Sequence, residues 1–261
     1  MTVSSTFIVI YFRYLCISYY THTPVMPPTL ILIRHAQALH NVNKKYHLPD
    51  PNLSGTGLKQ CLELREHLRE ALKDLDVGLV VVSPMRRTIQ TAILSLDWLT
   101  DRGVPIRASA LWQENSNKPC DTGSAVEELM EEFPMVDFSG LDPVWPDKAS
   151  ERGRVYAYNR RAIVERARKA LTELKACGEK AVVVVSHSGF MRQGMTGSWW
   201  FNADYRVFEF EGEELELRQW EATRKGGMGK SWEERVIVGE GIPEEDKAEV
   251  PGEDKGVPEL N

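Results

Sequence analysis

The stretch from Thr29 to Asn41, TLILIRHAQALHN, decides the fold. Its first part, Thr29 to Ile33, contains an uninterrupted run of aliphatic residues that includes β-branched members. Such a run predicts a parallel strand buried on both faces. The run leads directly into Arg34 and His35, and in open α/β sheets ligands bind beyond the carboxyl ends of the strands. The pair therefore marks a candidate binding edge.

The chain repeats this arrangement of an apolar run followed by polar side chains. Val77 to Val82 is a second apolar run and leads into Ser83, with Arg86 shortly after it. Ala181 to Val185 is a third, and it leads into Ser186 and His187. Because parallel strands end at the same edge of a sheet, we expect these polar groups to converge.

Amphipathic segments separate the apolar runs. The helices expected span about residues 55–73, 85–99, 124–132 and 154–177, with a short strand near Ile106. A turn at Gly212 between apolar segments 207–210 and 215–220 predicts an antiparallel hairpin. The alternation predicts an α/β fold, a three-layer αβα sandwich with a mostly parallel central sheet.

The domain organisation follows from composition. Residues 26–223 form the predicted catalytic domain. Residues 1–25 are apolar and aromatic, but Arg13 interrupts them and they are too short to span a bilayer, so we interpret them as a disordered or non-native extension rather than a signal peptide or anchor. Residues 224–261, rich in Gly, Pro, Glu and Lys, predict a mostly disordered acidic tail.

Charge and cysteine content narrow the class of protein. The net charge is −6, and residues 239–261, with eight acidic and two basic side chains, account for all of it. A near-neutral body does not favour a nucleic-acid partner. The four cysteines are far apart and show no metal-type spacing, which indicates reduced thiols, a cytoplasmic location and no metal site. No membrane partner is expected, and the sequence carries no signal for an oligomeric state.

Two histidines and two arginines at one sheet edge would form a cationic pocket, which suits a phosphoryl dianion. Neighbouring cations lower a histidine's pKa, so the imidazole would stay neutral in the empty pocket. A neutral imidazole is a nucleophile when its other nitrogen donates to a backbone carbonyl. The leaving alkoxide needs a proton, and Glu114 is the candidate general acid, with Glu127 and Glu128 as alternatives.

Taken together, these motifs resemble the histidine phosphatase superfamily, the phosphoglycerate mutase-like fold. RHAQALHN matches the family's Arg-His-Gly-x-x-x-x-Asn, with Ala36 at the glycine position, and VVSHSGF resembles its second-histidine motif. LWQENSNKPCDTG resembles the segment that carries the acid in fungal members. The resemblance implies that His35 is the phosphorylated nucleophile.

The resemblance also implies roles for other residues between about Thr29 and Gln219. Arg34, Arg86 and His187 would hold the phosphoryl group, Asn41 would help to bind it, and Glu114 would be the acid. SPMRRTIQTA offers two arginines, and counting back from its Thr-Ala pair selects Arg86 over Arg87. His40 and His47 are interpreted as surface loop residues, although either could rim the pocket.

The predicted function is hydrolysis of a phosphomonoester, a small phosphorylated metabolite, through a phosphohistidine intermediate. No metal or other cofactor is expected, because the arginines and His187 neutralise the phosphoryl charge. One alternative is a mutase. The mutase motif has Gly-Glu-Ser after its Arg-His pair, whereas this chain resembles it only in that pair and has Ala36-Gln37-Ala38 next. The other is a catalytically silent interaction domain, against which the intact set of polar residues argues.

Overall fold

Strand β1 (Thr29–Arg34) lies inside a seven-stranded sheet with the order β4-β3-β2-β5-β1-β6-β7. The computed structural model describes residues 26–244. Strand β1 pairs in parallel with β5 and antiparallel with β6, while β2 pairs in parallel with β5 and β3. The aliphatic run Leu30–Ile33 is fully buried. Burial on both faces is the environment that its sequence predicts.

The other elements follow the predicted alternation. The strands are β2 (Val77–Val82), β3 (Ile106–Ala108), β4 (Val136–Asp137), β5 (Ala181–Ser186), β6 (Tyr205–Glu211) and β7 (Glu216–Gln219). The helices are α1 (Gly55–Ala71), α2 (Arg86–Ser95), α3 (Asp97–Thr100), α4 (Val126–Glu132), α5 (Arg160–Lys175) and α6 (Ser188–Met191).

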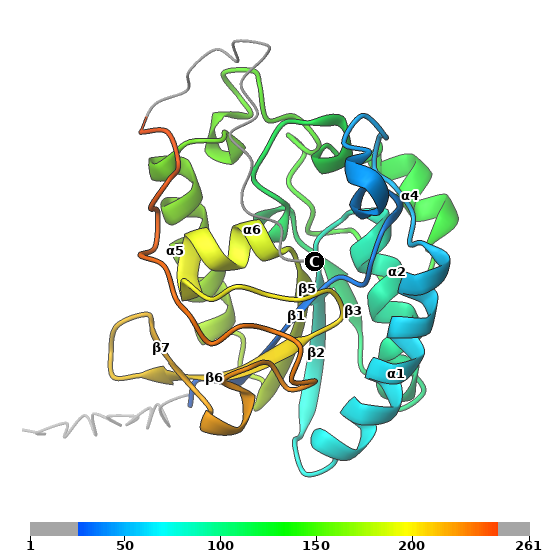
Figure 1. Ribbon diagram of the computed structural model, residues 1–261, viewed down its shortest axis with the longest axis vertical. Helices are drawn as coiled ribbons and strands as arrows, with labels where there is room; N and C mark the ends of the chain where they lie inside the picture. The colour runs from blue at the N-terminus through cyan, green and yellow to red at the C-terminus, as the bar shows by residue number, and fades with distance from the viewer. Residues whose placement is uncertain (1–25, 245–261) are drawn as a thin grey trace, which may run out of the picture.

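Helices cover both sides of the sheet. Figure 1 shows α1 and α2 on one side and α5 and α6 on the other, with the sheet between them. The strand pairs are parallel except those that involve β6. The prediction of an α/β three-layer fold with a mostly parallel sheet is confirmed.

The strand register brings the polar ends of three strands together. Arg34 of β1 lies opposite Ser186 of β5, and Val82 of β2 lies opposite Val185. The backbone N–H of His35 then donates to the Ser186 carbonyl at 3.0 Å. The residues that follow β1, β2 and β5 therefore meet at one edge, as parallel pairing requires.

The helix boundaries differ in two places from the prediction. The helix expected over 154–177 begins at Arg160, where Asn159 accepts a hydrogen bond from the N–H of Ala162 and caps it. The helix expected over 85–99 is divided at Leu96 into α2 and α3. Neither change moves the residues at the sheet edge.

The expectation of a disordered tail from residue 224 is wrong for residues 224–244. Asp204, which is fully buried, accepts hydrogen bonds from the backbone of Met228 and Lys230 and from the Ser231 hydroxyl. The ring of Trp232 stacks on Trp199 at 4.5 Å between centroids. A polar segment is held here by hydrogen bonds to its backbone, which composition does not reveal. The proposed extension 1–25 and residues 245–261 lie outside the described residues.

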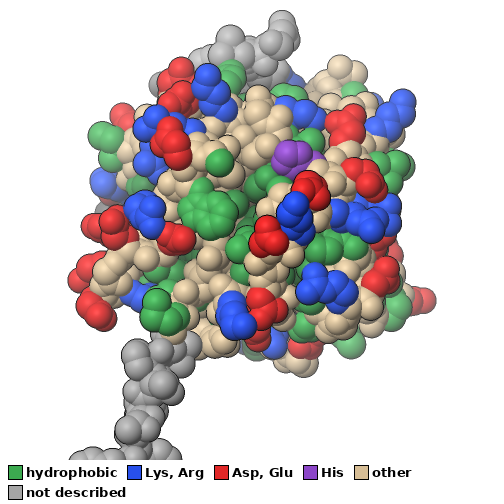
Figure 2. Space-filling view, turned by 90° about the horizontal axis from the view of Figure 1, so that it is seen from below, with side chains coloured by type: hydrophobic (Ala, Val, Ile, Leu, Met, Phe, Trp, Pro, Cys, Tyr) green, Lys and Arg blue, Asp and Glu red, His purple; other side chains and the backbone are tan. Residues whose placement is uncertain are grey.

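The helices and the surface can be compared with the expectation of no membrane partner and no nucleic-acid partner. Within residues 26–244, no helix combines the length and apolar character needed to cross a bilayer. Figure 2 shows basic and acidic side chains interspersed on the face seen there, with hydrophobic side chains between them. That face lacks the continuous basic surface that a nucleic-acid backbone would require.

Candidate active site

His35 lies directly after β1 and is almost completely buried, with 2% of its surface exposed. Its Nδ1 lies 2.7 Å from the carbonyl oxygen of Ala36, so this nitrogen carries the proton and donates it. Burial, followed by the charges of Arg87 and Arg34, lowers the pKa of His35 well below its usual value. The ring is therefore neutral, with the lone pair on Nε2. This is the tautomer that a nucleophilic imidazole requires.

Arg87, not Arg86, is the arginine of this site, and the prediction that chose Arg86 is wrong. The Arg87 side chain is fully buried. Its Nε donates to His35 Nε2 at 3.3 Å, and an Nη lies 3.2 Å from His187 Nδ1. Its other contacts are the carbonyl of Cys120 and the carboxylate of Asp121. These contacts place a guanidinium between the two imidazoles.

Arg86 faces a different part of the molecule. Its guanidinium forms ion pairs with Asp50, Glu128 and Glu132 and contacts Ser124. Successive residues in a helix point about 100° apart, so only one of two adjacent arginines at the start of α2 can face the histidines. Three carboxylates hold Arg86 on the side of α4.

His187 follows β5 and is fully buried. Its Nε2 lies 2.8 Å from the hydroxyl of Ser83, which follows β2. Its ring meets that of His35 edge-on at 5.2 Å between centroids. Burial, followed by the charge of Arg87, lowers the pKa of His187 well below its usual value. The ends of three strands thus contribute to one cluster, as predicted.

Arg34 and Arg192 add cationic charge beside this cluster. An Arg34 Nη donates to the Trp200 carbonyl at 2.7 Å. Burial lowers the pKa of Arg34 to about 10, and the charges of Arg87 and Arg192 act in the same direction. The Nε atoms of both Arg34 and Arg192 are buried without a hydrogen-bond partner among the described residues. Buried donors without acceptors are costly, so an anion would stabilise this arrangement.

Glu114 lies in the loop after β3, and the start of α6 holds its carboxylate. Oε2 accepts a hydrogen bond from the N–H of Gly189 at 3.2 Å, and Oε1 accepts one from Asn115 at 2.9 Å. A Cβ at position 189 would lie 2.5 Å from Oε1, so only glycine allows this approach. Burial, with a further contribution from Asp121, raises the pKa of Glu114. A carboxyl that keeps its proton suits a general acid.

Lys148 is a buried residue that the sequence did not single out. Its Nζ donates to the backbone carbonyls of Glu114, Ser116 and Asp121 at 2.7, 2.9 and 2.5 Å. These three acceptors match the three N–H donors of an ammonium group. Lys148 therefore fixes the loop that carries both Glu114 and the carboxylate partner of Arg87.

The side chain of Asn41 contacts Ala38 and His40. Its Oδ1 accepts a hydrogen bond from the N–H of Ala38, and its Nδ2 lies 3.0 Å from His40 Nε2. His40 is buried, with its ring 5.8 Å from that of His35, so its interpretation as a surface residue is wrong. Asn41 thus borders the site through His40, and a phosphate-binding role for it stays a prediction.

This geometry combines a neutral imidazole, cations around it and a carboxyl group whose pKa is raised, a set of groups that suits phosphoryl transfer. A family model, the histidine phosphatase superfamily (branch 1), matches residues 30–223. The chain belongs to the histidine phosphatase superfamily. The resemblance inferred from the sequence motifs is confirmed.

Other members and relatives of the histidine phosphatase superfamily resemble this chain. A Schizosaccharomyces pombe protein named "Probable phosphatase" is 30% identical over 164 residues, 61% of this chain and 73% of the relative. A "Phosphoglycerate mutase-like protein" of Arabidopsis thaliana is 31% identical over 201 residues, 62% of this chain and 72% of the relative. The solved phosphoglycerate mutase of Bacillus anthracis str. Sterne is 16% identical, with a TM-score of 0.49 over 75% of this chain and 93% of that one.

Proposed function

We propose that this protein is a phosphomonoester hydrolase that works through a phosphohistidine on His35. The observation that carries the proposal is the state of His35: buried, neutral, with Nδ1–H held by Ala36 and Nε2 facing Arg87. This nitrogen attacks phosphorus, and the Arg87 donors that now meet His35 and His187 turn to the phosphoryl oxygens. Membership of a phosphatase family supports the same reading.

Glu114 completes the reaction. In the first step its proton passes to the leaving alkoxide as the phosphorus–oxygen bond breaks and the bond to His35 Nε2 forms. In the second step Glu114 takes a proton from water, which attacks phosphorus and releases inorganic phosphate and free His35. Arg34, Arg87 and His187 bear the charge of the transferring group, and Asn41 assists at its border.

The proposed substrate class rests on the charge of the site. The proposed substrate is a small phosphorylated metabolite, and the cationic residues would bind its phosphoryl group. Cys61, Cys120 and Cys177 are free thiols, which fits the cytoplasmic location that we propose.

The decisive experiment compares wild type with His35→Ala on p-nitrophenyl phosphate, with His47→Ala, an exposed histidine, as the matched control. We expect hydrolysis by wild type and His47→Ala, none by His35→Ala, and an acid-labile phosphoenzyme that only the first two form. Inert wild type, both here and on a panel of phosphorylated metabolites, would contradict the proposal. Transfer of the phosphoryl group to a second hydroxyl of the substrate, in place of release as phosphate, would identify a mutase instead.

A further inference from the structure

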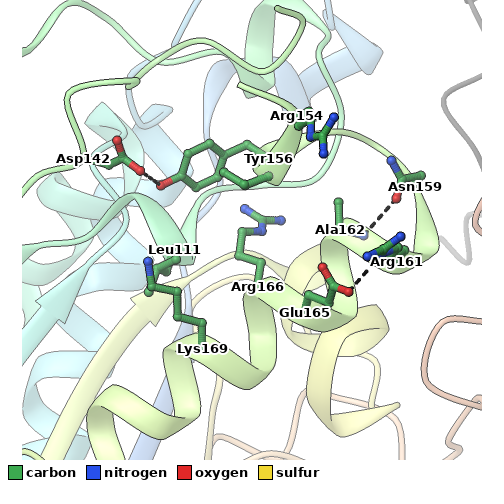
Figure 3. A pocket seen from close by; sticks show the side chains of 11 residues that line it. Leu111, Asp142, Arg154, Tyr156, Asn159, Arg161, Ala162, Glu165, Arg166 and Lys169 are labelled. Carbon is green, nitrogen blue, oxygen red and sulfur yellow. Dashed lines mark hydrogen bonds and ion pairs between the residues drawn. The ribbon is translucent and has the colours of Figure 1, made fainter. Parts of the chain in front are cut away.

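A cavity of about 600 Å³ lies along α5, outside the histidine cluster. It is enclosed by one face of α5, the short turn Arg154–Tyr156 and Leu111 (Figure 3). Its lining includes none of the residues that the proposed reaction uses. We call it the α5 cavity, and nothing in the proposed function accounts for it.

The lining of the α5 cavity carries more positive than negative charge. Four basic side chains line it, namely Arg154, Arg161, Arg166 and Lys169, together with two acidic ones, Asp142 and Glu165. The two acids already have partners within the protein. Glu165 forms an ion pair with Arg161 at 3.0 Å, and Asp142 accepts from the Tyr156 hydroxyl at 2.7 Å. Among the described residues, Arg166 and Lys169 form no ion pair with a carboxylate.

Arg166 is the residue that points most directly to a ligand. Only 3% of it is exposed, and burial lowers its pKa to about 10. Its Nη atoms donate to the Gln113 carbonyl and Asn115 Oδ1, both at 2.8 Å, while its Nε has no partner among the described residues. The charge of Glu114 acts on Arg166, and the Phe190 ring packs against its guanidinium at 4.1 Å, but neither gives Nε an acceptor. A buried donor without an acceptor is costly. Figure 3 shows its guanidinium in the middle of the lining side chains.

The same cavity has apolar walls. Leu111 and Ala162 lie on its sides, Tyr156 presents its ring, and Val155 is exposed at the edge. Lys169 extends along the cavity toward Leu111 (Figure 3). A ligand that fits this lining has an anionic group for the two cations and an apolar body for the walls.

We propose that the α5 cavity binds a small organic carboxylate with an apolar body, at a site separate from the histidine cluster. The carboxylate neutralises Arg166 at the floor and accepts a hydrogen bond from the Lys169 ammonium. The apolar body packs against Tyr156 and Val155. The proposal rests on the charge and shape of this cavity alone, so it stands or falls independently of the phosphatase activity.

The test uses benzoate as the probe and benzamide as its uncharged counterpart, on the full chain. Binding is followed by ligand-observed NMR titration in saturating inorganic phosphate, which keeps the histidine cluster occupied. We expect benzoate to bind and benzamide to bind at least about tenfold more weakly, because the charge on the ligand supplies the attraction. Equal binding of the two probes, no binding of benzoate, or displacement of benzoate by phosphate would overturn the proposal.

Variants on α5 locate the site. Lys169→Glu reverses an exposed charge in the cavity without disturbing the core, and Arg168→Glu makes the same change on the same helix outside the lining. Benzoate affinity should fall at least about tenfold in Lys169→Glu and stay within about twofold of wild type in Arg168→Glu. The proposal is wrong if both variants weaken binding equally or if neither does.

Discussion

Arg86 and Arg87 are adjacent in sequence, yet their side chains meet opposite chemical environments. Arg86 pairs with three carboxylates, whereas Arg87 lies between two neutral imidazoles and pairs with one carboxylate, that of Asp121. A guanidinium among carboxylates is already neutralised and has little attraction left for a substrate anion. We therefore expect the second arginine of the pair, Arg87, to hold the phosphoryl group.

Substituting each arginine by glutamine tests this assignment. Arg87→Gln should lower kcat/KM for p-nitrophenyl phosphate roughly 10²–10³-fold, the usual cost of losing one transition-state donor. Arg86→Gln, the matched control, should leave kcat/KM within about threefold, because Arg86 contacts Glu128 and Glu132 instead of the histidines. An equal loss in both variants, with both folded by circular dichroism, would contradict the assignment.

The proton on Glu114 predicts a pH dependence of the rate. Because burial raises its pKa, the general acid stays protonated above the usual range of a carboxyl group. The value of kcat/KM, which reports transfer to His35, should therefore decline only as pH rises through that raised pKa. His35 stays neutral well below pH 6.5, so protonation of the nucleophile should not limit the rate just below that pH. Glu114→Gln should remove the alkaline decline from the profile of kcat/KM against pH. Persistence of the same decline in this variant would assign it to another group.

His40 predicts a pH dependence of stability. Burial lowers its pKa from 6.5 to about 2, so the folded state keeps it neutral while the unfolded state binds a proton below pH 6.5. Its contribution is present above pH 6.5 and is lost as pH falls toward the folded-state value. The free energy of unfolding, measured with urea at each pH, should therefore fall more steeply for wild type than for His40→Asn. The two slopes against pH should differ by about 1.4 kcal/mol per pH unit between pH 6 and 4. Parallel curves would show that His40 is not buried in this way.

At the scale of elements, the loop after β3 depends on a single buried lysine. Lys148 donates to three backbone carbonyls of that loop, and burial lowers its pKa to about 7. Lys148→Met should lower kcat roughly ten- to a hundredfold through displacement of Glu114, with less change in KM. Lys118→Met, an exposed lysine of the same loop, should have little effect. A change confined to KM would show that Lys148 acts on substrate binding instead.

Sequence patterns predicted β1, β2 and β5 well, because a continuous apolar run is stable mainly where both of its faces are buried. The polar residues after β1, β2 and β5 could be assigned to one site on that basis alone. The choice between Arg86 and Arg87 could not, because it depends on the phase of α2 and on the distant carboxylates of α4. The role of Lys148 could not be predicted either, because its acceptors are backbone carbonyls, which the sequence does not distinguish from any others.

At the scale of the whole molecule, residues 224–244 pack against the start of β6, where the N–H of Gly227 donates to the Tyr205 carbonyl. Asp204 accepts hydrogen bonds from this segment. Arg206 donates hydrogen bonds to its Trp232 and Arg224 carbonyls. Removing it would leave buried charged groups without partners. A chain ending at Thr223 should lose several kcal/mol of unfolding free energy, roughly 1–3 kcal/mol for each buried group left unpaired, relative to one ending at Glu244. Equal denaturation midpoints for the two chains would contradict this.

The position of β1 has a consequence for biosynthesis. Its two neighbours, β5 and β6, are made about 150 and 175 residues later, so this apolar strand leaves the ribosome long before either partner exists. At roughly 5–20 residues per second, the interval until Glu211 is synthesised is about ten to thirty-five seconds. During that time both edges of β1 are open to other nascent chains. The strand that leads into His35 is thus a segment that a chaperone would protect during synthesis.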